Sequence, residues 1–298
     1  MSNQRWLEGY RVRIILLSPT RIGAGAEGNL QQVLSPRLST IYAFTGASLG
    51  PGGGAARARL QRLPVIPASS LKGLLRSLAE RIAASIYHDY RGRDPSSLSA
   101  QEVPRFLAAL HHQPTYQEEE ERRRNQRIQS SPVHAYEEPP ELDYVDRCAP
   151  RGPEGAPTDW RYEAFASRYC PICLLFGSNF QAGAIRLRDA IPEKGEAKTT
   201  IRTHVSIDRG TRTKSEAKLY TEELVEAGTV FVTKLYLLWP LETPQEMRNN
   251  ECMELYNAAI EEARRLWNIV KEYLETNEVQ IGGGKTIGHG AVKIELES

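Results

Sequence analysis

The sequence predicts an α+β protein built on a ferredoxin-like core, which is a βαββαβ unit. Three observations predict this fold class. Once the irregular stretches are set aside, the periodic segments follow the order strand, helix, strands, helix, strand. Residues 199–225 have the composition of an extended two-stranded arm, and residues 89–182 look like an insertion. A chain of 298 residues is long enough for one large domain that buries a core and carries such insertions, so we expect a single domain over 1–298.

The first half of the core begins with a strand over residues 10–18. This segment starts with alternation and ends in an apolar run, so one face should be buried while Arg11 and Arg13 lie on the other. An irregular stretch follows to about residue 63, and its glycine-rich basic part has no means of packing by itself. A helix then begins at Ser69 or Ser70. Its apolar stripe consists of Leu71, Leu74, Leu75, Leu78, Ile82 and Ile86.

The second half of the core follows the insertion. Within the insertion, residues 89–169 show little apolar periodicity, which indicates mixed structure without a second core. Strands are predicted at 183–190, 230–239 and 290–297, the first and last of them alternating. A long amphipathic helix is predicted over 243–275. The residues expected to face inward on it are Ile260, Leu266, Trp267, Val270 and Leu274.

The net charge of +1 hides an uneven distribution of charge. Residues 1–88 hold eleven Lys and Arg against three acids, Glu8, Glu27 and Glu80, so the rest of the chain is acidic. A basic region on a neutral protein is typical of a docking surface for a polyanion. The alternative is a solvated basic face without a partner.

Two cations in the first turns of the predicted helix at 69–86 strengthen the polyanion interpretation. Lys72 and Arg76 lie four residues apart on the face opposite the apolar stripe. They would stand beside the unpaired backbone N–H groups of the helix start, which together make an anion site. Long amphipathic side chains that merely solvate the helix are the alternative.

Cysteine spacing predicts a structural zinc site in the insertion. Cys170 and Cys173 form the Cys-x-x-Cys pair of a zinc knuckle, and Cys148 with His134 can complete a tetrahedral site, with His111 and His112 as weaker candidates. A polar insertion gains stability from such a metal. The alternative is a pair of small buried side chains, which is how we interpret Cys252. The four cysteines thus indicate metal binding in a reducing cytosol rather than disulfides.

A glycine-rich turn precedes the last strand. Residues 281–290 contain Gly-Lys-Thr, but the first glycine of a P-loop would fall at Val279, and no helix follows. A turn that lifts backbone N–H groups and Lys285 toward a phosphate fits better. Cations also gather on or beside the predicted arm, more than solubility needs, and they favour contact with a phosphate backbone. They are Lys198, Arg202, Arg209, Arg212, Lys214 and Lys218.

Five motifs in this order carry a family resemblance. They are Arg21-Ile-Gly-Ala-Gly, Ile66-Pro-Ala-Ser-Ser-Leu-Lys-Gly-Leu-Leu-Arg, Cys170-x-x-Cys-Leu-Leu-Phe-Gly, His204-Val-Ser-Ile-Asp-Arg-Gly-Thr and Gly282-Gly-Gly-Lys-Thr-Ile-Gly-His-Gly. Their order and spacing, from about residue 10 to 296, resemble the RAMP superfamily of CRISPR-associated proteins, and within it the backbone subunit of type III effector complexes.

The resemblance implies a ferredoxin-like core with a β-hairpin thumb, an architecture also used by RNA-recognition folds. It implies CRISPR RNA, target RNA and other effector subunits as partners, with copies stacked along the RNA in a ribonucleoprotein that serves antiviral defence. The residues that we then expect to bind RNA are Arg21, Lys72, Arg76, His204, Arg209, Arg212, Lys214 and Lys285.

One departure from the family pattern concerns cleavage. Members that cut target RNA use an aspartate in the loop after the first strand, and Leu34 stands at the comparable place here. Leucine cannot supply the carboxylate, and Glu27 is the only acid in that loop. We therefore expect a subunit that binds RNA without cutting it. The alternative is a RAMP endoribonuclease with His204 or His289 as general base, and a general single-strand RNA-binding protein is a third, less specific reading.

The sequence also predicts where the protein works. The N-terminal residues lack the apolar region and cleavage site of a signal peptide. No run of about 18 apolar residues is present to span a membrane. Together with the cysteine usage, these features predict a cytoplasmic protein.

Overall fold

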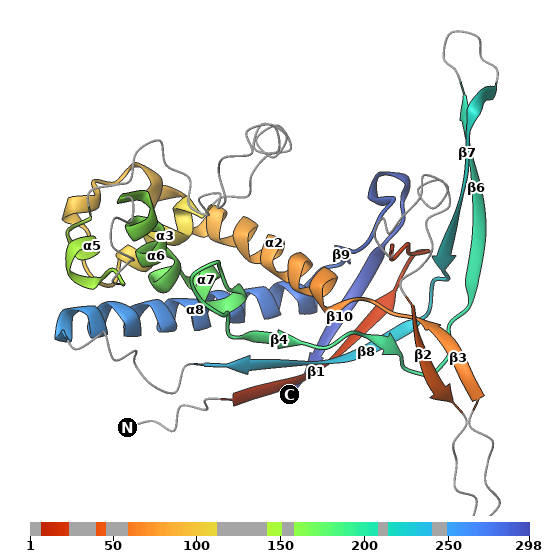
Figure 1. The fold of residues 1–298 in the computed structure, drawn as a ribbon, viewed down its shortest axis with the longest axis horizontal. Coiled ribbons are helices and arrows are strands. Elements are labelled where there is room, and N and C mark those ends of the chain that lie inside the picture. The colour runs from red at the N-terminus through yellow and green to blue at the C-terminus, as the bar shows by residue number, and fades with distance from the viewer. Residues whose placement is uncertain are drawn as a thin grey trace, which may run out of the picture. The chain divides into compact units, whose positions relative to one another are not determined.

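The computed structural model describes residues 7–23, 40–45, 59–111, 142–150, 158–207, 214–239 and 249–298. Within them the chain is a mixed α+β protein (Figure 1). The strands are β1 (Leu7–Leu16), β2 (Thr40–Thr45), β3 (Arg59–Pro64), β4 (Ile185–Leu187), β5 (Ile191–Pro192), β6 (Thr199–Ile207), β7 (Lys214–Val225), β8 (Val230–Leu238), β9 (Val279–Gln280) and β10 (Ala291–Glu297). The α-helices are α2 (Ala68–Ile86), α3 (Val103–Leu110), α5 (Asp143–Cys148), α6 (Thr158–Tyr169), α7 (Pro171–Phe176) and α8 (Asn250–Thr276), and the short 3₁₀ helices are η1 (His88–Gly92), η2 (Pro95–Ser97) and η3 (Lys285–Ile287).

The chain divides into two compact units. One comprises residues 1–8, 72–186 and 236–273, and the other comprises 9–71, 187–235 and 274–298. We call them the helical unit and the sheet unit, after the elements that dominate each. No helix in the described part of the chain combines the length and the apolar character needed to cross a membrane.

The main sheet has the strand order β4-β8-β1-β10-β9, with β5 paired to β8. β10 pairs antiparallel with β1, and Ile14 faces Ile294 across the pair. Side chains alternate between buried and less buried along the second half of β1 and along β8, as the period of a half-buried strand requires. Fully buried residues of these strands, such as Ile14 and Phe231, form the core of the sheet unit.

Two separate hairpins complete the sheet unit. β2 and β3 pair antiparallel, and β6 and β7 form a long two-stranded ribbon in which Thr199 faces Val225 (Figure 1). The ribbon occupies the stretch 199–225 that the sequence predicts to be an extended arm. Its described base contacts the segment after β1, because Thr20 and Val225 exchange backbone hydrogen bonds.

The helical unit has a core of its own, contrary to the expectation for residues 89–169. α3 is buried along most of its length, and in α6 the side chains of Tyr162, Phe165 and Tyr169 are at most 1% exposed. These helices have 8 and 12 residues, too short to reveal a helical period in the sequence. The insertion is therefore a packed helical structure in its described parts.

The two long helices follow the predicted apolar faces with small shifts. In α8, Leu266, Trp267, Val270 and Leu274 are buried as predicted, whereas Ile260 is half-buried. In α2, Leu71, Leu75 and Leu78 are buried. Ile86 at the end of α2 is exposed, since Ala79 and Ala83 take the inner positions of its last turns.

Candidate metal centre and nucleic-acid interface

One histidine and two cysteines converge in the core of the helical unit. The Nδ1 atom of His111 lies 3.6 Å from the Sγ atom of Cys170 and 3.8 Å from that of Cys173. In tetrahedral zinc geometry a nitrogen ligand and a sulfur ligand lie about 3.6 Å apart, given the usual bond lengths. All three residues are buried, and their ligand atoms lie within 4.8 Å of one another. Two sulfurs and an imidazole form a soft donor set that fits Zn²⁺ rather than Mg²⁺ or Ca²⁺.

Local sequence explains why these three side chains meet. Cys170 precedes α7 as its N-cap, with Pro171 at the first helical position, so Cys173 follows one turn later on the same side. His111 caps the C-terminus of α3. α7 ends at Gly177, which has a φ of 86°. A Cβ on Gly183 would lie 2.3 Å from the Gly177 nitrogen, so this close approach requires glycine.

A buried ion pair on α2 borders the centre. The Nε2 atom of His111 lies 3.0 Å from Oε1 of Glu80, and the same oxygen accepts a 2.9 Å hydrogen bond from Nε of Arg76. Arg76 also donates to the carbonyl oxygen of Gly177 at 3.3 Å, and its second terminal nitrogen lies 3.2 Å from His111 Nε2. Glu80 and His111 are both buried.

Burial and charge shift the pKa values of this cluster. Burial alone would raise the pKa of Glu80, but hydrogen bonds and charges from His111 and then Arg76 outweigh it and hold the pKa below its usual range. The hydrogen bond with Cys170, followed by burial, raises the pKa of the Cys173 thiol well above its usual value. A divalent cation bound here would reverse that preference by stabilising the thiolate, and its binding would release protons.

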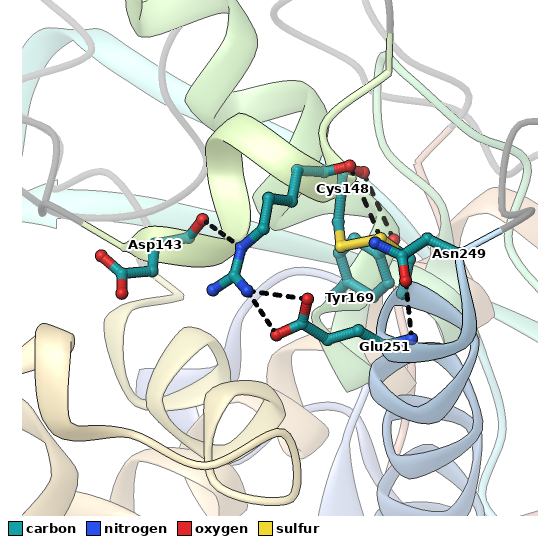
Figure 2. The surroundings of a disulfide bond; sticks show 7 residues. Asp143, Cys148, Tyr169, Asn249 and Glu251 are labelled. Carbon is teal, nitrogen blue, oxygen red and sulfur yellow. Dashed lines mark hydrogen bonds and ion pairs between the residues drawn. A yellow bond between two sulfur atoms is a disulfide. The ribbon is translucent and has the colours of Figure 1, made fainter.

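The structure corrects one of the predicted zinc ligands. Cys148 is not part of the cluster but forms a disulfide with Cys252, so it has no thiolate for a metal (Figure 2). The expectation that the cysteines form no disulfides is therefore wrong for this pair. His134 and His112 lie outside the described residues. Within the described part of the chain, His111 is the candidate nitrogen ligand. The segment 103–110, once recognised as a buried helix, would have pointed to His111.

The surroundings of the disulfide fasten α5 to the first turn of α8. One terminal nitrogen of Arg147 contacts both carboxylate oxygens of Glu251, at 2.7 and 2.8 Å, and the Oδ1 atom of Asn249 caps α8 by accepting from the Glu251 nitrogen (Figure 2). The Tyr169 hydroxyl donates to the Cys148 carbonyl oxygen at 3.3 Å. This clamp, consisting of Arg147, Cys148, Glu251 and Cys252, joins residues 104 positions apart in the chain.

Lys72 and Arg76, the predicted anion site on α2, have different surroundings. Arg76 points to Glu80 and Gly177, as described above. Lys72 is half-buried, and the pKa of its ammonium is lowered by burial first and then by the nearby positive charges of Arg186 and Arg76. Among the described residues neither Lys72 nor Arg186 has an acidic partner, whereas Arg186 donates to backbone carbonyls of its own segment. Sequence reasoning missed Arg186 because it is distant in the chain.

A second cluster forms in the sheet unit around the glycine-rich turn. Arg21 pairs with the buried Glu222 on β7 at 3.2 Å, and its carbonyl oxygen accepts from the Gly283 nitrogen. A Cβ on Gly282 would lie 2.0 Å from the Arg21 carbonyl oxygen, and Gly282 has a φ of 77°, so the turn needs glycine there. Lys285 is exposed in this turn.

His289, a candidate general base, is buried in the same cluster. Its Nδ1 atom lies 3.5 Å from Oε1 of Glu222, and its Nε2 atom lies 3.4 Å from a terminal nitrogen of Arg202 on β6. The ring is therefore flanked by a carboxylate and a guanidinium within the protein. In this environment, the His289 side chain can hold the glycine-rich turn against the base of the β6–β7 hairpin.

Several predicted residues lie beyond what the structure describes. Glu27, Leu34, Arg209 and Arg212 are outside the described residues. His204 faces Tyr220 on the paired strands β6 and β7, and Lys214 faces Ile207 near the end of that pairing.

Comparison with known proteins gives one family. The family described as the RAMP superfamily matches residues 13–293. No curated protein matches the chain. Among solved structures, the chain is similar to one from a structure titled "Type IV-B CRISPR Complex", with 14% sequence identity and a TM-score of 0.47, over 98% of this chain and 91% of that chain.

Proposed function

The chain belongs to the RAMP superfamily, and on this premise we propose that it is an RNA-binding backbone subunit of a CRISPR effector complex. In this role it holds CRISPR RNA and target RNA in the cytoplasm, beside stacked copies or related subunits. The observation that carries the proposal is the family match over residues 13–293, which includes all five motifs. The resemblance of the motif spacing to type III backbone subunits makes a type III-like complex the finer proposal.

The sheet topology supports a ferredoxin-like core. In a βαββαβ unit the last strand lies beside the first, and the first lies beside the third. β1, α2, β4, β8, α8 and β10 follow one another in the chain, and their strands stand in the order β4-β8-β1-β10. The strand order of the core is unchanged by the two additions to it, which are the long insertion between α2 and β4 and the arm between β4 and β8.

The β6–β7 hairpin is the proposed thumb. Its length and its position between β4 and β8 agree with the arm predicted from the cations of residues 198–218. Arg202 and Lys285, on the hairpin base and in the glycine-rich turn, are exposed and positively charged. Phosphate contacts of this kind hold an RNA in register without reading its sequence.

Zinc is the proposed metal of the His111–Cys170–Cys173 centre, with a structural role. The support is the donor set and the separation of its atoms, which match a tetrahedral zinc site in which a fourth ligand completes the shell. Bound there, Zn²⁺ would hold α7 to the end of α3.

The endoribonuclease alternative is less favoured. His289 is buried between Glu222 and Arg202, so its ring nitrogens face protein groups rather than a substrate hydroxyl. With Leu34 in the place of the family aspartate, we propose that this subunit does not cut RNA.

The test of this function is binding and cutting by the lone chain. Purified protein should bind single-stranded CRISPR repeat RNA in fluorescence anisotropy, with an affinity that falls linearly with the logarithm of the salt concentration. The same mixture, with and without a chelator, should leave the RNA intact. Absence of RNA binding would contradict the proposal, and a discrete cut by the lone chain would favour the endoribonuclease.

A further inference from the structure

We propose that Glu80 and Arg76 are the outer shell of the metal centre, so that Arg76 serves the metal and not the RNA. Glu80 orients His111, and Arg76 orients Glu80. The inference rests on the proposed metal site at His111, Cys170 and Cys173, but it does not depend on RNA binding.

The first step is the tautomer of His111. A metal at this site takes the Nδ1 lone pair, because Nδ1 is the ring atom that faces both sulfurs, at 3.6 and 3.8 Å. The proton of the neutral ring must then sit on Nε2. Nε2 lies 3.0 Å from Oε1 of Glu80, so the carboxylate accepts this N–H and fixes both the tautomer and the ring orientation. Metal-binding histidines are held by carboxylates in this way in many proteins.

The second step is the charge of the carboxylate. Glu80 is 7% exposed, and a buried carboxylate needs a cation or several hydrogen bonds. Arg76 provides the cation at 2.9 Å, on the same helix and one turn earlier. Two thiolates would balance the charge of a bound Zn²⁺, and Arg76 balances the charge of Glu80, so neither buried anionic group would lack a cation.

The third step links Arg76 to the ligands directly. Its terminal nitrogen donates to the Gly177 carbonyl oxygen at 3.3 Å, and the Gly177 nitrogen donates to the carbonyl oxygen of Cys173 at 2.8 Å. One guanidinium thus contacts both the carboxylate that orients His111 and the C-terminal cap of the helix that carries Cys173. A lysine could not do both, because it lacks the planar fork of donors.

The experiment titrates purified protein with Co²⁺ and then displaces it with Zn²⁺ in competition with a chromophoric chelator. The wild-type chain should show the sulfur-to-cobalt charge-transfer and d–d bands of a tetrahedral site. Glu80→Gln and Arg76→Gln should each lower the metal affinity by about 10- to 100-fold and alter the d–d bands. Arg76→Lys should fall between the wild type and Arg76→Gln.

Two control variants distinguish a role in the outer shell of the metal centre from the general effects of losing a positive charge or a buried carboxylate. Arg81→Gln removes one exposed positive charge from the same helix, and the Arg81 guanidinium donates to the Ser77 carbonyl oxygen rather than to the centre. This variant should leave the metal affinity unchanged. Glu262→Gln removes another buried carboxylate of the helical unit, which Tyr87 and Arg105 contact. It should lower stability and leave the cobalt spectrum unchanged.

The outcomes decide between the alternatives. Wild-type metal affinity and spectrum in both Glu80→Gln and Arg76→Gln overturn the proposal, and so does a wild-type chain that binds no Co²⁺ or Zn²⁺. An equal loss in Glu262→Gln also overturns it, because the effect would then come from the fold. RNA binding measured on the same variants tests the proposed function separately, since Arg76→Gln should retain the salt dependence of the wild type.

Discussion

At the scale of single residues, Lys72 shows how a residue proposed to bind RNA can oppose stability. Burial and two neighbouring cations lower its pKa, which means that the folded chain disfavours the charged ammonium. A phosphate placed against Lys72 and Arg186 would relieve this cost. In the proposed complex, the same charge that weakens the free protein would therefore strengthen RNA binding.

We predict that Lys72→Gln weakens RNA binding without lowering stability. The slope of log affinity against log salt should fall by about one unit, and the loss should be similar for all RNA sequences. Because the unfolded chain keeps its proton at a pH where the folded Lys72 starts to lose it, the destabilisation caused by Lys72 should shrink as the pH rises through the folded pKa. Unfolding midpoints of both proteins at pH 7 and at pH 10 measure this. A variant that is less stable than the wild type at pH 7 would contradict the prediction.

Gly282 gives a second prediction at this scale. Gly282→Ala forces a side chain into a positive φ and against the Arg21 carbonyl oxygen, so we expect a loss of about 3 kcal/mol in the free energy of unfolding. Gly228→Ala is the matched control, because Gly228 has a φ of 83° but open space around its Cβ position. It should cost about 1 kcal/mol. Equal losses in chemical denaturation would show that the contact with Arg21 is unimportant.

The residue types in the sequence predicted what kind of site the cysteines form better than they predicted which residues contact one another in the fold. The Cys-x-x-Cys spacing identified two candidate metal ligands, because Cys170 caps the short helix α7 and Cys173 lies on it. His111, by contrast, is 59 positions from Cys170, and the partner of Cys148 is 104 positions away, so tertiary packing alone decides both. The sequence predicts RNA binding for Arg76, because it cannot show that the nearby acid Glu80 is buried and paired with Arg76.

At the scale of elements, the clamp joins α5 to α8 by a covalent bond and an ion pair. α5 has only six residues, and a helix of that length has little stability of its own. Its position depends on the Cys148–Cys252 bond and on the Arg147–Glu251 ion pair. Because the ion pair is partly exposed, the covalent bond should provide most of the stabilisation.

We predict that removing the disulfide lowers the free energy of unfolding by about 2 to 4 kcal/mol. Cys148→Ser with Cys252→Ser should show this as a lower guanidinium midpoint than the oxidised wild type. The metal affinity of this double variant should remain that of the wild type, since neither residue is a ligand. Equal midpoints for oxidised and reduced wild-type protein would indicate that the bond does not stabilise the fold.

Long periodic elements were predictable and short ones were not. The predicted strand at 10–18 corresponds to β1 at Leu7–Leu16, and the predicted helix at 243–275 overlaps α8 at Asn250–Thr276. α3, α6 and α7 were missed, because each has 12 residues or fewer and lies in a segment interrupted by charged and proline-rich stretches. Their burial comes from packing on one another, which a periodicity count does not detect.

At the scale of the whole molecule, the candidate metal centre lies in one compact unit, whereas the residues proposed to contact RNA lie in both. The metal centre and the clamp belong to the helical unit, which also contains Lys72 and Arg186. The glycine-rich turn, Arg21 and the β6–β7 hairpin belong to the sheet unit. Changes to the metal centre should therefore affect stability first, whereas changes to the hairpin base should affect RNA binding first.

The prediction at this scale concerns cleavage in an assembled complex. If Leu34 occupies the place of the family aspartate, Leu34→Asp should introduce a cut in the target RNA at the position that faces this subunit, because it restores a carboxylate near the scissile phosphate. Sequencing gels of target RNA incubated with wild-type and variant complexes measure this. A wild-type subunit that already cuts there, and loses the cut with Glu27→Ala, would contradict the non-cleaving assignment.

The bond between Cys148 and Cys252 also has a topological consequence. It closes a covalent ring that includes α6, α7, the whole β6–β7 hairpin and β8. A protease that cuts the backbone once anywhere inside this ring cannot separate the two fragments. The nicked protein should migrate as a single species in a denaturing gel without reductant and as two species with it, so a cut hairpin would escape notice unless the sample is reduced.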